Sequence, residues 1–393
     1  MLESIDGVSP REAIEPASAE EMAAALASAS TRRASVVIYG GGTKLGWGRT
    51  PESVDIGVST GRLNALVAHE HADLTATVQA GMRLDQFNHL LARHGQWLPV
   101  ESAFDTSTIG GAIATNDSGP LRHRYGTPRD LLIGIRLALA DGRIIKAGGN
   151  VVKNVAGYDI GRLMSGSHGS LAAILSATFK LMPLPGASST LVASFESSDA
   201  LIAALTAIRS SQLEASAIEV RAGRPYQLLL KFESTPGALN AHVQQARALL
   251  GSAPCQVVTS EPETSLWREY LRAPWKSSGM IVRLAWLPAS LGAVLAAIDD
   301  VCAGVRCVKL MGRAAIGAGL LRIDADAAVQ ETIVNSLRAR TDVLSHVVVL
   351  RAEPRVKHRL DVWGSLGDAA ALGAAVKRAL DPNGILNAGR GPV

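Results

Sequence analysis

The chain has 393 residues, of which 47% are hydrophobic and 19% are charged, and it contains 38 glycines. This composition excludes a disordered chain, and the length predicts two or three globular domains with a sizeable core. The net charge is only +4, and the lysines and arginines are scattered among acidic residues. Such scattering argues against a nucleic-acid-binding face, but it does not exclude a positively charged cleft for a smaller ligand.

The cysteines and the N-terminal residues indicate a reducing compartment. Cys255, Cys302 and Cys307 form no C-x-x-C pair, so we expect neither a disulfide framework nor an iron–sulfur or other metal site. The first thirty residues are rich in glutamate, which is wrong for a signal peptide, and no apolar run approaches the ~20 residues of a spanning helix. The sequence therefore predicts a cytoplasmic protein, with peripheral attachment to the inner membrane through partners left open.

The N-terminal part has the pattern of a small β/α unit. Its expected elements, in chain order, are a helix over 18–29, strands over 36–39, 54–58 and 74–79, and a helix over 83–94. A hairpin is expected further along, from strands over 131–138 and 143–147 around the Asp141-Gly142 turn. The strand over 36–39 runs directly into a glycine-rich loop, which is typical of a phosphate-binding turn.

That first loop is Gly40-Gly41-Gly42-Thr43-Lys44-Leu45. Successive glycines let backbone N–H groups converge on phosphate oxygens, and Lys44 would add positive charge. The loop does not match the Walker pattern, which requires Ser or Thr after the lysine, because Leu45 stands there. It does not match G-x-G-x-x-G either, because Leu45 occupies the position of the third glycine. A phosphate site and a plain glycine-rich turn therefore both remain open from this loop alone.

Two further loops favour a long anionic ligand. The second loop runs from Asp105 to Gly119, and its donors between glycines are Thr106, Ser107, Thr108, Asn116 and Ser118. The third comprises residues 153–159 and 166–170, followed by an aliphatic strand over 171–181. Three such loops together suit a dinucleotide such as FAD.

The composition of the chain changes after Pro183 and Pro185, because clusters of glycine become rarer. Beyond this point, expected helices and strands alternate, with helices over 199–210, 236–250, 288–302 and 326–340, and strands over 217–221, 227–232, 280–286 and 347–350. A helix over 368–380 and a polar tail follow. The sequence thus predicts an α+β protein with domains over 1–185, 186–352 and 353–393, the second being a helix-backed, mainly antiparallel sheet.

Five ordered motifs carry a family resemblance. They are Gly40-Gly-Gly-Thr, Thr108-Ile-Gly-Gly, Tyr125-Gly-x-x-Arg-Asp, Lys153-Asn-Val-Ala-Gly-Tyr-Asp and Gly166-Ser-x-Gly. Their order resembles the two-subdomain FAD-binding domain of the vanillyl-alcohol oxidase and p-cresol methylhydroxylase (PCMH) superfamily. The segments that begin at Asp361 and Asp381 look like the closing part of its 2-hydroxyacid dehydrogenase branch. Within that branch, the chain is most similar to the FAD-binding E subunits of glycolate oxidase.

The resemblance implies FAD bound without a covalent link, because Thr43 and Lys44 follow the glycines where some relatives have a linking histidine. It implies that residues 40–45 hold the pyrophosphate and that Arg390 returns toward the flavin. The remaining implied cofactor residues are Thr106, Thr108, Ile109, Gly110, Gly111, Asn116, Ser118, Gly119, Arg129, Lys153 and Gly157. Asp130 and Asp159 could equally cap helices, and Arg390 could pair with a surface acid.

Two departures leave the catalytic residues unassigned. Longer relatives place a histidine cluster on the substrate domain, whereas residues 186–393 contain only the widely spaced His242, His346 and His358. His168 also stands where many relatives have glutamate, and a lone histidine on such a loop is more often packed than catalytic.

The resemblance implies a subunit that oxidises glycolate, or one that relays electrons between a larger FAD-containing catalytic subunit and an iron–sulfur subunit. A stand-alone dehydrogenase for another 2-hydroxy acid such as D-lactate, and a flavin-bearing assembly subunit without catalysis, remain alternatives.

Overall fold

The computed structural model describes residues 4–150, 158–305 and 309–392, and they form two compact units. The first unit comprises Met1–Gly119, Gly126–Leu184 and Ser365–Val393, and the second comprises Pro120–Tyr125 and Pro185–Gly364. The change of composition near Pro185 thus coincides with the start of the main part of the second unit. Residues 120–125 also belong to the second unit, and no feature of the sequence predicted this.

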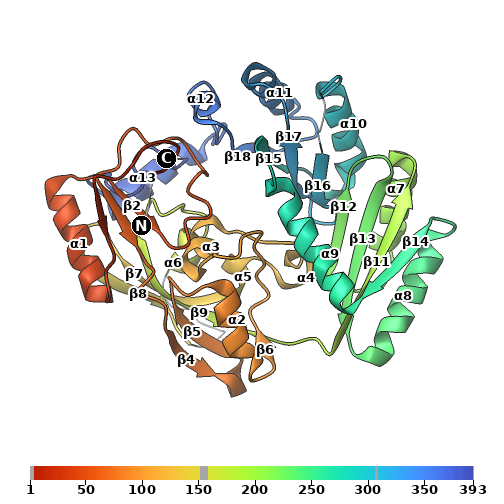
Figure 1. Ribbon diagram of the computed structural model, residues 1–393, viewed down its shortest axis with the longest axis horizontal. Helices are drawn as coiled ribbons and strands as arrows, with labels where there is room; N and C mark the ends of the chain where they lie inside the picture. The colour runs from red at the N-terminus through yellow and green to blue at the C-terminus, as the bar shows by residue number, and fades with distance from the viewer. Residues whose placement is uncertain (1–3, 151–157, 306–308, 393) are drawn as a thin grey trace. The chain divides into compact units, whose positions relative to one another are not determined.

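A small parallel sheet with the order β1-β3-β2 opens the first unit. Figure 1 labels its strand β2. The strands of the sheet are β1 (Glu12–Ile14), β3 (Ile56–Ser59) and β2 (Val36–Tyr39), and α1 (Ala19–Arg32) packs on it. Helix α1 begins after Ser18, whose hydroxyl accepts the backbone N–H of Glu21 over 3.0 Å, as an N-cap should. Met22 and Leu26 of the helix are fully buried.

The second sheet of the first unit is antiparallel and five-stranded, with the order β4-β5-β9-β7-β8. Its strands are β4 (Leu66–Glu70), β5 (Thr75–Gln79), β9 (Ala173–Lys180), β7 (Leu132–Ala138) and β8 (Ile144–Gly148). Helices α2 (Leu84–Ala92), α3 (Ile109–Thr115) and α6 (Ile160–Met164) contribute to its core. Phe87 and Ile113 are buried there with Val78 and Phe179.

Shorter elements complete the first unit. They are η1 (His71–Asp73), β6 (Gln96–Trp97) paired with β10 (Met182–Pro183), α5 (Pro128–Leu131) and α13 (Ala369–Leu380). The tail beyond α13 joins the parallel sheet, because Leu386 forms a parallel bridge with Val36. The C-terminal segment is therefore part of the first unit.

The second unit is built on an eight-stranded antiparallel sheet with the order β14-β11-β13-β12-β16-β17-β15-β18. In chain order these strands are β11 (Ala187–Phe195), β12 (Ala217–Arg221), β13 (Tyr226–Ser234), β14 (Cys255–Thr259), β15 (Met280–Ala285), β16 (Lys309–Arg313), β17 (Ala318–Ile323) and β18 (His346–Arg351). The helices are α4 (Arg122–Tyr125), α7 (Ser198–Arg209), α8 (Pro236–Leu250), α9 (Ser260–Arg272), α10 (Leu291–Val301), α11 (Ala327–Ala339) and α12 (Pro354–Lys357), with 3-10 turns η2 (Ala273–Trp275) and η3 (Pro288–Ser290).

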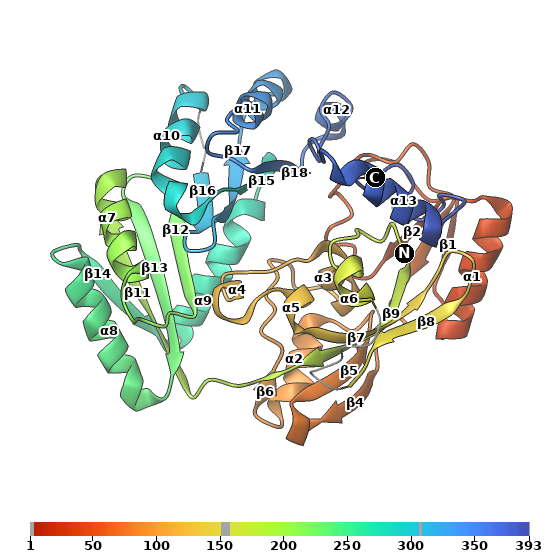
Figure 2. The same cartoon turned by 180° about the vertical axis from the view of Figure 1, so that it is seen from behind.

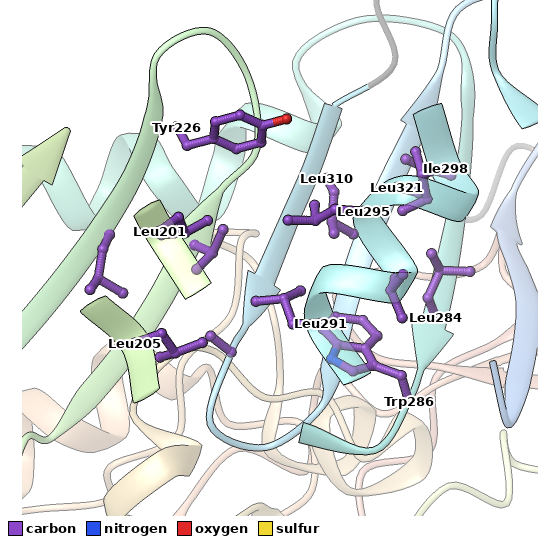
Figure 3. Packing of buried hydrophobic residues seen from close by; sticks show 14 of the residues in the cluster. Leu201, Leu205, Tyr226, Leu284, Trp286, Leu291, Leu295, Ile298, Leu310 and Leu321 are labelled. Atoms are coloured by element: carbon purple, nitrogen blue, oxygen red, sulfur yellow. The ribbon is translucent and has the colours of Figure 1, made fainter. Parts of the chain in front are cut away.

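The two faces of this sheet have different coverings (Figure 2). Leu228 and Leu230 of β13 belong to the main core, to which α7, α8, α10 and α11 contribute. Leu229, which points to the opposite face, packs instead with Trp267 and Tyr270 of α9. Figure 3 shows part of the main core, in which Leu291 and Leu295 of α10 lie among the strand residues.

The helix-backed antiparallel sheet and the Asp141-Gly142 hairpin are confirmed, as is the α+β fold class. The expected helix over 288–302 is shorter, because its first residues form the 3-10 turn η3. The expectation that residues 105–119 form a loop was wrong in part, because residues 109–115 form α3, which begins after the capping residue Thr108. The sequence prediction also missed the strands β1, β4, β6, β10, β11, β14, β16 and β17 and the helices α4, α5, α6, α9 and α12. Among the described residues, no helix has the length and apolar character needed to cross a bilayer.

Candidate functional site

A cavity in the first unit gathers the glycine loops. It encloses about 800 Å³ of space between protein atoms, part of it open to solvent. Its wall comes from the end of β2 and the loop after it, from α3, from the start of β9, and from the C-terminal tail. Its lining residues are Ile38, Tyr39, Gly40, Gly41, Gly42, Thr43, Lys44, Leu45, Trp47, Thr60, Ala80, Thr108, Gly110, Gly111, Ala114, Thr115, His168, Gly169, Ala172, Ile174, Asn387 and Arg390.

The first loop needs glycine because the second loop passes directly against it. A Cβ atom on Gly41 would overlap the backbone carbonyl of Thr106, and one on Gly40 would overlap the side chain of Thr108. Gly42 has a φ of +69°, which favours glycine. The two loops can therefore meet only where the first loop lacks side chains.

The donors of this loop fit an anionic cofactor. Within the described part of the chain, no hydrogen bond joins the backbone N–H groups of Gly41, Gly42 or Thr43 to a protein acceptor. These residues line the cavity. Unpaired N–H groups in a glycine loop are suited to phosphate oxygens, so the residues present fit the pyrophosphate of a dinucleotide.

Lys44 sits at the junction of the first two loops. Its Nζ lies 3.0 Å from Oδ2 of Asp117 and donates to Oγ of Ser107 over 3.1 Å. The lysine side chain is only 6% exposed. Its positive charge is therefore already paired with a carboxylate of the second loop.

The third loop is fixed to α3 through backbone hydrogen bonds. The N–H of His168 donates to the carbonyl of Ala114 over 2.7 Å, and that of Gly166 donates to Ile113 over 3.0 Å. His168 adopts a left-handed backbone with a φ of 54°. This geometry places His168 and Gly169 in the cavity wall.

The C-terminal tail closes another side of the cavity. Arg390 is 3% exposed, and its guanidinium donates to the carbonyl oxygens of Leu45 and Trp47 and to Oδ1 of Asn387. Burial lowers the pKa of Arg390 to about 10, and the carboxylate of Asp6 opposes that shift. Because its donors are directed at backbone carbonyls, Arg390 braces the segment that follows the first loop.

The expected cofactor residues divide into three groups. Residues 40–45, Thr108, Gly110, Gly111 and Arg390 line the cavity. Those outside the lining are Thr106, Ile109, Asn116, Ser118, Gly119 and Arg129. Lys153 and Gly157 lie outside the described residues.

Several residues of the second group have structural contacts. Ile109 is fully buried in the core, and Asn116 ends α3 with a φ of 46°.

The two aspartates expected either to cap helices or to lie near the cofactor have local partners. Asp130 accepts the backbone N–H of Thr127 over 2.8 Å, and Asp159 accepts that of Arg162 over 2.9 Å. Both aspartates are thus helix-capping residues in the structure.

Sequence reasoning missed half of the wall. Tyr39, Thr60 and Ile174 lie at strand ends or directly after them, Trp47 lies in the connection between β2 and β3, and Asn387 belongs to the tail. The one sequence signal near these residues was the strand over 36–39 that runs into the glycine loop, and it pointed to the loop rather than to these side chains.

Tyr125 belongs to the second unit, although its motif was expected near the flavin. Its hydroxyl donates to Oε2 of Glu233 over 3.0 Å, and burial, followed by the charge of Glu233, raises the pKa of Tyr125 well above its usual value. Arg124 donates to the carbonyl of Glu233 over 3.1 Å. These contacts anchor residues 120–125 to β13.

The described histidines of the second unit do not cluster. His242 lies in α8 with its ring 5.7 Å from that of Phe232, His346 begins β18, and His358 follows α12. Burial lowers the pKa of His123, which lies in α4. Across the described residues, no group of three or more histidine, cysteine or acidic side chains could hold a metal ion.

Comparison with known proteins finds similarity to an FAD-binding domain and to 2-hydroxy acid oxidoreductases. The family model described as an FAD binding domain matches residues 10–148. The chain is 38% identical over 181 residues to a D-lactate dehydrogenase of Archaeoglobus fulgidus, a match that covers 45% of this chain and 41% of that protein. It is 32% identical over 220 residues to glycolate oxidase subunit GlcE of Escherichia coli, covering 55% of this chain and 59% of that protein. The chain thus spans less than two thirds of either relative.

The fold has a solved counterpart. A structure of alkyldihydroxyacetonephosphate synthase superposes with a TM-score of 0.74 at 16% identity, covering 96% of this chain and 75% of that one. This likeness confirms the PCMH-type fold and nothing about activity. The family model separately shows that residues 10–148 of this chain are similar to an FAD-binding domain.

Proposed function

We propose that the chain is an FAD-dependent oxidoreductase that acts on the CH–OH group of a 2-hydroxy acid, as the FAD-binding E subunit of a glycolate oxidase complex. The observation that carries this proposal is the cavity, in which an FAD-binding fold presents unpaired N–H groups from a glycine loop. The names of the two relatives supply the substrate class.

The chain's own residues have separable roles in this proposal. Gly41, Gly42 and Thr43 donate backbone N–H groups to the pyrophosphate, and the hydroxyl of Thr108 caps α3 beside them. Arg390 holds the segment after the loop in place. Bound FAD would supply the electron acceptor for oxidation of the hydroxy acid.

The missing histidine cluster favours a chain that works with partners. Its partners in the proposal are a larger FAD-containing catalytic subunit and an iron–sulfur subunit, since the described residues offer no metal-ligand group. In that arrangement the flavin of this chain either oxidises glycolate or passes electrons onward. The similarity to a D-lactate dehydrogenase makes D-lactate the second substrate to test.

The test is the visible spectrum of the purified chain under anaerobic conditions, before and after addition of glycolate or D-lactate. Bleaching of bound flavin by one acid assigns oxidation to this chain and identifies the substrate. Flavin that stays oxidised until the partner subunits are added assigns the relay role. Flavin that stays oxidised with the complete complex and both acids would refute 2-hydroxy acid oxidation.

A further inference from the structure

Five side chains form a continuous polar network between the first and second loops. Lys44 pairs with Asp117 over 3.0 Å and donates to Ser107 over 3.1 Å. Ser102 bridges both partners, with its hydroxyl 2.8 Å from Oδ2 of Asp117 and 2.7 Å from Oγ of Ser107. Thr43 lies 3.5 Å from the same Ser107 oxygen. The network spans residues 43–44 on one side and residues 102–117 on the other.

The surroundings make this network costly to break. Lys44 is 6% exposed and Asp117 is 17% exposed at their side chains. The ammonium group also lies 5.9 Å from the ring centroid of Trp47 and 5.6 Å from that of Phe104, within the range of cation–π attraction. Removing one member of a buried ion pair leaves the other charge without compensation, so the pair holds the two loops together.

This arrangement bears on what Lys44 does at the site. A lysine that follows a glycine loop would be expected to point its charge at phosphate oxygens. Here two acceptors of the second loop already take its ammonium group. The unpaired donors of the first loop are instead the backbone N–H groups of Gly41, Gly42 and Thr43.

We propose that Lys44 is a positioning residue: it acts through Asp117 and Ser107 to hold the segment over 102–119, which includes α3, against the phosphate loop, so that the cavity is formed before FAD arrives. The inference rests on the proposed function, because it concerns the same cofactor cavity. Phosphate binding then falls to the backbone, and Lys44 contributes by preorganisation.

Two charge-removing variants separate this role from direct phosphate contact. Lys44→Met keeps the aliphatic stem and removes the ammonium group, while Asp117→Asn keeps the shape and removes the carboxylate. If Lys44 positions the loop, both variants raise the dissociation constant of FAD about tenfold, and the double variant raises it no further. If Lys44 were a phosphate ligand restrained by Asp117, Asp117→Asn would free its charge, and FAD would bind as tightly or more tightly.

The deciding measurement needs no cofactor. Hydrogen exchange of the peptides that cover residues 102–119 is compared in the cofactor-free chain and in each variant. We expect about tenfold faster exchange in Lys44→Met and Asp117→Asn, with no change in Lys146→Met, which removes an exposed lysine on β8. Unchanged exchange in Lys44→Met, or tighter FAD binding in Asp117→Asn, would overturn the proposal.

Ser107→Ala provides a gentler variant if the charge variants fail to fold. It deletes the hydroxyl at the centre of the network and should speed exchange of the same peptides to a smaller extent. Unchanged exchange would count against the network. Hydrogen exchange is measured without FAD, so its result does not depend on whether the cavity binds FAD. If the wild-type chain failed to bind FAD, the proposed cofactor site would be refuted, but the exchange comparison would still test the network.

Discussion

The side-chain amide of Asn387 donates a hydrogen bond to the backbone carbonyl of His168 over 2.5 Å. This contact joins the C-terminal tail to the third loop, and both residues line the cavity. Asn387 also accepts a hydrogen bond from Arg390 over 2.9 Å. Asn387 therefore ties the tail to the third loop, and its partner Arg390 ties the tail to the segment that follows the first loop.

Asn387→Gly isolates the side chain, because glycine keeps the left-handed backbone, with a φ of 50°, at no steric cost. Losing two buried hydrogen bonds should weaken FAD binding by up to about thirtyfold, since each contributes about 1 kcal/mol. Fluorescence titration with FAD measures the change. A dissociation constant equal to that of the wild type would show that the tail does not support the cavity.

Asp381 anchors the tail from within the core. It is 1% exposed and accepts the N–H groups of Ile385 and Leu386, over 3.1 and 2.8 Å, together with the ammonium of Lys377 over 2.6 Å. Asp381→Ala leaves these donors buried without that acceptor and should lower the free energy of unfolding by about 3–5 kcal/mol. Urea unfolding provides the value.

The matched control for that variant is Asp85→Ala. Asp85 pairs with Arg83, but its side chain is 55% exposed. Exposed pairs contribute about 0–1 kcal/mol. Equal losses in the two variants would contradict an anchoring role for Asp381.

Cys302 should be unreactive at neutral pH. Burial, and to a smaller extent the nearby carboxylate of Asp299, raises the pKa of its thiol to about 11. Because the thiolate is the nucleophile, alkylation by iodoacetamide at pH 8 should be about a hundredfold slower than in the urea-unfolded chain. Mass spectrometry of the Cys302 peptide follows the reaction, and equal rates in the two states would refute the buried thiol.

The same shift fixes the sign of a stability change. The folded state holds the thiol proton more tightly than the unfolded chain, whose reference pKa is 9.0. The contribution of Cys302 to stability is therefore complete below about pH 9 and is lost as pH rises toward 11. Cys302→Ala should flatten the loss of stability over this interval.

Local signals predicted the parts of the fold that local chemistry determines. Ser18 marks the start of α1, and the Asp141-Gly142 turn marks the β7–β8 hairpin. Helix α9 was missed because its exposed positions are polar, and only residues such as Trp267 and Tyr270 meet the sheet. Its position depends on partners such as Leu229, which lies far away in the sequence.

In the candidate site, too, local sequence predicts some features and tertiary contacts determine the others. Glycines 40–42 could be predicted as a ligand loop because their composition suits close backbone approach. The pairing of Lys44 with Asp117 could not, since it joins residues on separate loops that only the folded chain brings together. The contributions of Trp47 and Ile174 to the wall likewise follow from tertiary packing.

The most direct test of the FAD site is a titration of the cofactor-free chain with FAD, for the wild type and Gly41→Asp. The substitution places a carboxylate beside the unpaired N–H groups and overlaps the carbonyl of Thr106. Gly237→Asp is the control, because a Cβ at Gly237 meets no atom within 4 Å. We predict one FAD per chain, released intact on denaturation, for the wild type and Gly237→Asp, and none for Gly41→Asp. Full occupancy in Gly41→Asp would contradict the assignment of this cavity to FAD.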